Sequence, residues 1–362
     1  MNFSMLINQD KIKTIGRTYQ KDNLFFMNFS GSGLKFKTIT NKLTIKFYTY
    51  NYNVDSYPYV SILIDNDRKD YRIDEENNII TYSLSSSIHT VEILKRSESS
   101  VSFVAIEEII ADNFLEIQQE EKFKIEFYGD SLTCGFGNLS NNPEEKFTTE
   151  TESFLDSYAY LLSKKLNADY SAICVSGFPI YKSRWNEGFA IDSIADMVSI
   201  SDYKEDMTFE TAVAWDNGKF IPNLVIINLG SNDCSYFLPE AKWVDNLVKK
   251  YGDFNHVLTS KEFEAEMICL ENKIISFLDH LFSLYKDVKI IWALGMIYID
   301  DHIQKVFDKV LNNYKNKNLY QFNFKVRDIC DERGAVYHPN KKMHLIASEE
   351  LFTFIESIYT KQ

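Results

Sequence analysis

The sequence predicts a two-part chain, with an all-β sandwich over residues 1–115 followed by an α/β domain over residues 120–362. Residues 23–110 consist of short runs with apolar alternation or β-branched and aromatic enrichment, which is typical of strands. After the acidic, polar segment 112–120, apolar strand-like runs alternate with amphipathic segments of helix length. Such alternation favours a mainly parallel sheet with helices on its faces.

The strands expected in the first part are separated by Gly, Asn, Asp and Ser clusters, such as residues 31–33 and 65–67. Seven or eight antiparallel strands within about 90 residues are typical of a β-sandwich. The strand runs are LFFMNFS, GLKFKTI, KLTIKFYTY, YVSILID, IITYSLS, HTVEILKR and VSFVAIEEI.

The second part is expected to hold strands at KIEFYG, YSAICVSG, NLVIINLG and VKIIWALG. Three segments have the length and periodicity of helices: DSYAYLLSKKL, EFEAEMICLENKIISFLDHLFSLY and MHLIASEELFTFIESIY. Because functional loops of parallel sheets follow the carboxyl ends of the strands, those strand ends are where a site is expected.

The amino-acid composition limits the classes of partner that the protein is expected to bind. The net charge of −13 repels polyphosphate and anionic lipid, so neither nucleic acid nor membrane is an expected partner. Five widely spaced cysteines form no CxxC motif, which predicts reduced thiols and no metal site. The N-terminal residues lack an apolar signal region, which predicts a cytoplasmic protein unless a leader was removed before residue 1. The sequence does not indicate an oligomeric state.

Three strand ends carry groups suited to acyl transfer. In IEFYGDSLTCGFGN, Gly129 permits a tight turn, Asp130 can cap the next turn, and Ser131 is presented as a nucleophile. Gly177, in ICVSGFPI, offers an unshielded N–H, and Asn232, in INLGSNDCSY, offers a carboxamide donor. Each also has an ordinary interpretation, namely a helix-capping serine, a strand-ending glycine and a turn asparagine.

A general base is expected among the six histidines. His338 follows the short segment GAVY, is fixed by Pro339, and precedes the last helix, so its ring can reach the strand ends. His344 lies in or near that helix and is the alternative, although a structural role suits it better.

The ordered set GDS, SG, GSND and HPN resembles blocks I, II, III and V of the SGNH (GDSL) hydrolases, and more narrowly carbohydrate esterase family two. The resemblance implies a jelly-roll domain fused to a flavodoxin-like SGNH domain that removes acetyl groups from sugars or oligosaccharides without a metal or organic cofactor. It implies that Ser131 is the nucleophile, that His338 is the base, and that Gly177 and Asn232 complete the oxyanion hole with the Ser131 amide.

The sequence departs from the family pattern before His338, where Ala335 and Val336 replace the expected aspartate. A Ser-His dyad with a backbone carbonyl orienting the imidazole is therefore expected. Tyr337, Trp185 and Trp215 are expected to line the sugar site, with ordinary packing as the alternative for both tryptophans. An acyltransferase, a general short-chain esterase or lipase, and a carbohydrate-binding protein with a decayed site remain the alternative functions.

Overall fold

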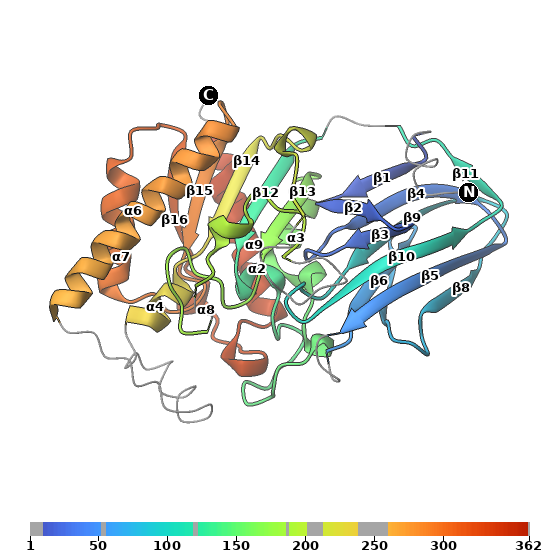
Figure 1. Ribbon diagram of the computed structural model, residues 1–362, viewed down its shortest axis with the longest axis horizontal. Helices are drawn as coiled ribbons and strands as arrows, with labels where there is room; N and C mark the ends of the chain where they lie inside the picture. Colours follow the sequence, from blue (N-terminus) through green and yellow to red (C-terminus); the bar gives the residue numbers. More distant parts are fainter. Residues whose placement is uncertain are drawn as a thin grey trace.

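A computed structural model describes residues 10–51, 56–118, 122–185, 188–200, 213–237 and 260–360. The chain forms an antiparallel β-sandwich on one side and an α/β unit on the other (Figure 1). The last sandwich strand ends at Leu115 and the first strand of the parallel sheet begins at Lys124.

Two antiparallel sheets make up the sandwich, and they enclose one apolar core. Along the first sheet the order is β1 (Ile12–Ile15), β4 (Gly33–Ile39), β9 (Ile88–Lys95), β6 (Tyr59–Ile64) and β7 (Asp67–Arg72), with β11 (Asn113–Leu115) also pairing with β4. Along the second sheet it is β2 (Thr18–Lys21), β3 (Leu24–Met27), β10 (Ser102–Ile110), β5 (Lys42–Asn51) and β8 (Ile79–Ser83).

The seven expected runs all form sandwich strands, but β1, β2, β7 and β11 were not anticipated. Strand β7 has the sequence DRKDYR and lies at the end of its sheet, where its side chains are exposed or half-buried. A strand of this kind has no apolar face to bury, so it lacks the alternation by which strands are found in a sequence.

The second part contains a five-stranded parallel sheet in the order β13 (Asp169–Cys174), β12 (Lys124–Gly129), β14 (Leu224–Asn228), β15 (Lys289–Leu294) and β16 (Leu319–Asn323). This is the 2-1-3-4-5 order of flavodoxin-like folds. The three central strands are buried almost throughout, which explains their continuous apolar runs. Edge strand β16, LYQFN, is only partly buried and was not predicted.

Helices cover both faces of this sheet. On one face, α3 (Tyr158–Lys165) and α9 (Lys341–Tyr359) pack on apolar side chains that include Ile125 and Phe127 of β12. On the other face, α6 (Ser260–Leu284) and α7 (Asp301–Asn313) pack on side chains that include Tyr128. The remaining α-helices that the described residues form are short: α2 (Ser131–Cys134), α4 (Ser231–Phe237) and α8 (Val326–Ile329). None of the described helices has the length and apolarity needed to cross a membrane.

The sandwich and the α/β unit meet through buried charges. Arg17 donates to Glu126 at 3.0 Å, with both side chains fully buried, and also to the carbonyls of Ala195 and Met197. Removing either member of such a pair leaves an uncompensated buried charge, which typically costs about 3–5 kcal/mol. Loss of these contacts between the two parts would therefore lower the stability of the protein.

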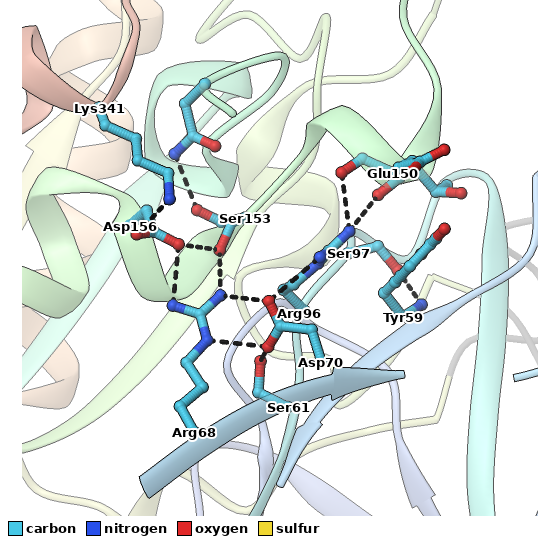
Figure 2. Close-up of polar contacts among 12 residues, drawn as sticks. Tyr59, Ser61, Arg68, Asp70, Arg96, Ser97, Glu150, Ser153, Asp156 and Lys341 are labelled. Carbon is cyan, nitrogen blue, oxygen red and sulfur yellow. Dashed lines mark hydrogen bonds and ion pairs between the residues drawn. The ribbon is translucent and has the colours of Figure 1, made fainter. Parts of the chain in front are cut away.

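A second polar network joins strand β7 to the segment before α3 (Figure 2). Arg68 donates to Asp156 at 2.8 Å and to Ser153 at 3.0 Å, and Asp156 also pairs with Lys341 at the start of α9. Arg96 donates to two backbone carbonyls of the same segment, at Thr149 and Glu150. The sandwich thus holds the segment between the Ser131 turn and α3, and through Asp156 this segment also contacts the start of α9, just after His338.

Candidate active site

Ser131 stands at a tight turn directly after strand β12. The carboxylate of Asp130 accepts the Leu132 N–H at 3.0 Å and caps the short helix α2. A side chain at Gly129 would meet the Thr133 hydroxyl at 2.0 Å, so only glycine fits there. The turn anticipated from the sequence therefore forms, with Ser131 at the first position of α2.

His338 faces Ser131 from the loop that precedes α9. Its Nε2 lies 2.9 Å from the Ser131 Oγ, and its Nδ1 lies 3.0 Å from the Val336 carbonyl oxygen. Because a carbonyl oxygen can only accept, Nδ1 carries the proton and donates it to Val336. The unprotonated Nε2 is then free to accept the Ser131 hydroxyl proton, which is the tautomer that a general base needs.

The carbonyl that orients His338 belongs to a strained loop. Val336 and Tyr337 have φ angles of 52° and 59°, in the left-handed region that is rare for a β-branched residue. Backbone hydrogen bonds hold this loop, from Ala335 N to the Gly137 carbonyl at 3.0 Å and from Val336 N to the Glu145 carbonyl at 3.1 Å. The main chain thus supplies the acceptor that an aspartate provides in a triad.

The imidazole of His338 is held neutral. Its pKa is lowered to about 4, chiefly because burial disfavours the charged ring; the bond to the Val336 carbonyl opposes this effect, and the nearby Arg333 adds to it. The ring also packs against Phe136, with the centroids 4.4 Å apart. At neutral pH the base is therefore available without deprotonation.

His344, the alternative base, has a structural place instead. It is fully buried, and its Nδ1 accepts the Tyr158 N–H at 3.1 Å, which joins α9 to α3. Burial lowers its pKa to about 3, so it remains neutral. Of the two histidines, only His338 contacts Ser131 among the contacts that the described residues make.

Gly177 and Asn232 border the same cavity as Ser131 and His338. Gly177 has a φ of 81°, which favours glycine, and it follows strand β13. The Asn232 Nδ2 donates to Asp130 at 2.9 Å and to the Phe178 carbonyl at 3.3 Å, so the orientation of its carboxamide is fixed. Gly177 and Asn232 thus line the cavity at Ser131, where an oxyanion hole is expected, and their role as its donors stays a prediction.

Comparison with known protein families shows to which family a chain with this site belongs. The GDSL-like lipase/acylhydrolase family matches residues 125–351, which is more than half of the chain. The chain belongs to the GDSL-like lipase/acylhydrolase family.

Individual relatives agree with this assignment. The chain is 25% identical over 278 residues to a cellulase/esterase, CelE, of Acetivibrio thermocellus, and the match covers 76% of this chain but only 30% of that relative. It is 26% identical over 277 residues to an acetylxylan esterase / glucomannan deacetylase of Cellvibrio japonicus, covering 73% of this chain and 72% of the relative.

Solved structures share the whole fold of this GDSL-family chain. A family two carbohydrate esterase from Clostridium thermocellum superposes with a TM-score of 0.77 at 20% identity, covering 96% of this chain and 99% of that one. An acetyl xylan esterase from Butyrivibrio proteoclasticus superposes with a TM-score of 0.78 at 21% identity, covering 97% and 96%. The expected combination of sandwich and SGNH domain is thereby confirmed.

The GDSL-family site is open to solvent through a cavity of about 850 Å³. Two of the three aromatic residues expected at the sugar site, Trp185 and Tyr337, line it. Trp215 does not. It lines a separate cleft beside Lys124, the first residue of β12, whereas Ser131 lies two residues beyond Gly129, the last residue of that strand. The expectation for Trp215 was wrong because the segment leading to β14 lies at the amino ends of the parallel strands, whereas Ser131 lies at their carboxyl ends.

Asp233 supports the site in a way that the sequence did not reveal. Its buried carboxylate accepts the backbone N–H groups of Ile180, Tyr181 and Lys182, at 3.1, 2.9 and 3.3 Å. Burial raises its pKa to about 7. Asp233 therefore fixes the segment after Gly177 against helix α4, which carries Asn232. The GSND motif marks the residue, but its partners lie some 50 positions away.

Glu98 reaches the site from the sandwich. Its Oε2 accepts the N–H of Ser176, the residue before Gly177, at 2.8 Å, and its own N–H donates to Glu152 at 2.9 Å. The buried Lys95 ammonium donates to the Glu98 carbonyl at 2.6 Å. No local pattern announces this contact, because Glu98 and Ser176 lie 78 positions apart.

Glu98, Cys134 and Glu152 form the group in the described chain whose ligand atoms are close enough to hold a metal, all within 4.8 Å. Burial raises the pKa of both the Cys134 thiol and the Glu152 carboxyl well above their usual ranges. The carboxyl groups of Glu98 and Glu152 already accept backbone N–H groups, those of Ser176 and Glu98 respectively. The adjacent Lys95 ammonium supplies positive charge instead, so the cluster suits a structural role.

Proposed function

We propose that this chain is a serine esterase that removes O-acetyl groups from carbohydrates through an acyl-enzyme. The observation that carries the proposal is the hydrogen bond from Ser131 Oγ to His338 Nε2, 2.9 Å long, beside the donors at Gly177 and Asn232. Relatives that share this domain are named cellulase/esterase and acetylxylan esterase / glucomannan deacetylase, which supports a carbohydrate ester as the substrate.

In the first half-reaction, Ser131 Oγ attacks the ester carbonyl while its proton passes to His338 Nε2. The negative charge that develops on the carbonyl oxygen is stabilised by the Ser131 and Gly177 amides and by the Asn232 carboxamide. His338 then returns the proton to the sugar oxygen as that oxygen leaves. Water, activated by the same imidazole, releases acetate and restores Ser131.

The low pKa of His338, about 4, sets the difficulty of the proton transfer. Forming the imidazolium at pH 7 costs about 4 kcal/mol, from three pKa units at 1.36 kcal/mol each. In the transition state the oxyanion lies close to the ring and offsets part of this cost. A carbonyl dipole at Val336 stabilises the imidazolium less than a carboxylate does, so the oxyanion donors contribute a larger share here than in a full triad.

The aromatic side chains that line the cavity support a sugar as the leaving group. Trp185 and Tyr337 can stack on a pyranose ring.

The proposal is tested with a fluorophosphonate probe, which reacts only with an activated hydroxyl, and with acetate release from a panel of acetylated mono- and oligosaccharides. Labelling of the wild type but not of Ser131→Ala, together with acetate release, is the expected result. Absence of labelling would favour the carbohydrate-binding alternative. Repeating the assay with excess free sugar separates hydrolysis from acyl transfer, because a transferase forms a new sugar ester instead of acetate.

A further inference from the structure

Positive charge gathers around the catalytic cavity. Although the chain carries a net charge of −13, three cationic side chains line this cavity, at Lys146, Arg327 and Arg333. Among the described residues that line the cavity, Asp331 is the single carboxylate, and His338 is neutral. The local balance therefore has the opposite sign to that of the whole chain, which an uncharged sugar ester does not require.

Most of this positive charge is not neutralised within the described part of the chain. Arg333 donates to Asp331 through its Nε at 2.6 Å, which accounts for the one carboxylate. No ion pair is formed by Arg327 or by the exposed Lys146 with other described residues. The Arg327 guanidinium instead lies 5.7 Å from the Tyr298 ring, and its Nη1 is buried without a hydrogen-bond acceptor among the described groups.

The two uncompensated cations come from different segments that both border the cavity. Lys146 lies in the loop between α2 and α3, and Arg327 lies in helix α8. Because a guanidinium binds oxyacids through paired N–H groups, Arg327 is the side chain best suited to bind an anion. Lys146 can add a longer-range attraction.

We propose that the carbohydrate ester cleaved at this site carries an anionic group, a carboxylate or a phosphate, within reach of Arg327 and Lys146. This inference rests on the proposed esterase function and narrows its substrate class to acidic acetylated sugars. The sugar ring would lie against Trp185 and Tyr337, and the ester carbonyl beside Gly177 and Asn232.

An anion in this cavity would also assist the proposed base. The positive charge of Arg333 contributes to the low pKa of His338. A bound anion opposes that effect, so it makes the imidazole a stronger base when substrate is present. Binding and proton transfer would then both favour an acidic substrate over a neutral one.

The test compares three acetylated substrates on the same pyranose ring: a methyl glucoside, the corresponding glucuronic acid derivative and a phosphorylated derivative. We expect kcat/KM for at least one anionic substrate to exceed that for the neutral one about tenfold at low salt. The ratio should fall as NaCl is raised to about 0.5 M, because screening weakens attraction between partly exposed charges. Comparing the carboxylate with the phosphate identifies the anion.

Arg327→Gln and Lys146→Gln should each lower this ratio, Arg327→Gln by about tenfold. Arg72→Gln is the matched control, because Arg72 is about half exposed on the sandwich and pairs with Asp74. It should leave the ratio unchanged. If Arg327→Gln fails to fold, the exposed Lys146 and the salt dependence of the wild type still decide the question.

A wild-type ratio near one, or a ratio that neither cavity variant changes, would overturn the inference. In that case acetate release from the neutral sugar would leave the proposed esterase function standing. Failure to release acetate from any of the three substrates, with no labelling of Ser131, would instead overturn the esterase function itself.

Discussion

Replacing Asp130 by Asn is expected to impair catalysis while leaving the fold nearly as stable as before. The Asp130 Oδ1 accepts the Leu132 N–H at 3.0 Å, and an asparagine oxygen can continue to do so. The Oδ2 accepts the Ser231 hydroxyl at 2.7 Å and the Asn232 carboxamide N–H at 2.9 Å. In the variant an NH₂ group occupies that position. The Ser231 hydroxyl can turn and accept from it, whereas the Asn232 NH₂ faces another donor.

The expected loss follows from what Asn232 is proposed to do. Removing one oxyanion-hole donor typically lowers kcat about 10²- to 10³-fold. If the Asn232 carboxamide turns away from its present orientation, Asp130→Asn should reach that range with little change in KM.

Stability is expected to change little because two effects oppose each other. Burial raises the pKa of Asp130 to about 6 from its ordinary value of 3.8, so keeping it ionised costs about 3 kcal/mol above pH 6. This cost is absent below pH 4, grows between pH 4 and about 6, and is fully present above that pH. The neutral asparagine removes this cost, but it leaves the buried Asn232 NH₂ facing another donor, and a buried donor without an acceptor costs about 1–3 kcal/mol.

The assay is kcat and KM on p-nitrophenyl acetate at pH 7–8, with Tm measured on the same samples. Ser231→Ala is the control, because it removes another donor to the same carboxylate oxygen and leaves the bond to Asn232 intact. We expect that control to retain kcat within about tenfold. A variant Asp130→Asn that folds normally and turns over at the wild-type rate would refute the reasoning that Asp130 orients Asn232.

Three further outcomes are expected. Ser131→Ala and His338→Ala should each lower kcat by about 10³-fold or more, and the double variant should be no worse, because groups that act as a unit are not additive. Asp331→Asn and Glu332→Gln should each keep kcat within about tenfold, since they pair with Arg333 and Lys342 and not with His338; a thousandfold loss would contradict the carbonyl-oriented dyad. Finally, kcat/KM should be higher for p-nitrophenyl acetate than for the octanoate, and the reverse order would indicate a lipase.

Much of the fold was predictable because buried positions recur in the sequence with the period of the strand or helix that carries them. The strands of the sandwich core alternate, and the central parallel strands are continuous apolar runs. Helix α7 was not predicted, although its buried Ile303, Phe307, Val310 and Leu311 have helical spacing after the capping Asp300. Strands β7 and β16 were not predicted either, because edge strands bury too little to show a period.

Some residues of the site could also be predicted from the sequence, whereas others could not. Ser131, Gly177 and Asn232 could be located because each follows a strand, and parallel strands bring their carboxyl ends together. Glu98 could not be found, because its link to the strand-end loop crosses from one domain to the other. Trp215 was misplaced, since an aromatic residue in the sequence does not indicate whether it lies at the amino or the carboxyl ends of the strands.

The missing aspartate is the point at which the structure adds most to the sequence. When only side chains are considered, Ala335 and Val336 indicate that the group that orients the histidine has been lost. Left-handed conformations at Val336 and Tyr337 turn the main chain so that the Val336 carbonyl meets the imidazole at 3.0 Å. Strain of this kind costs about 1–3 kcal/mol for each residue, and it persists only where the surroundings enforce it. The hydrogen bonds that the Ala335 and Val336 N–H groups donate to the Gly137 and Glu145 carbonyls enforce it here, so this loop can orient His338 without the carboxylate of a triad.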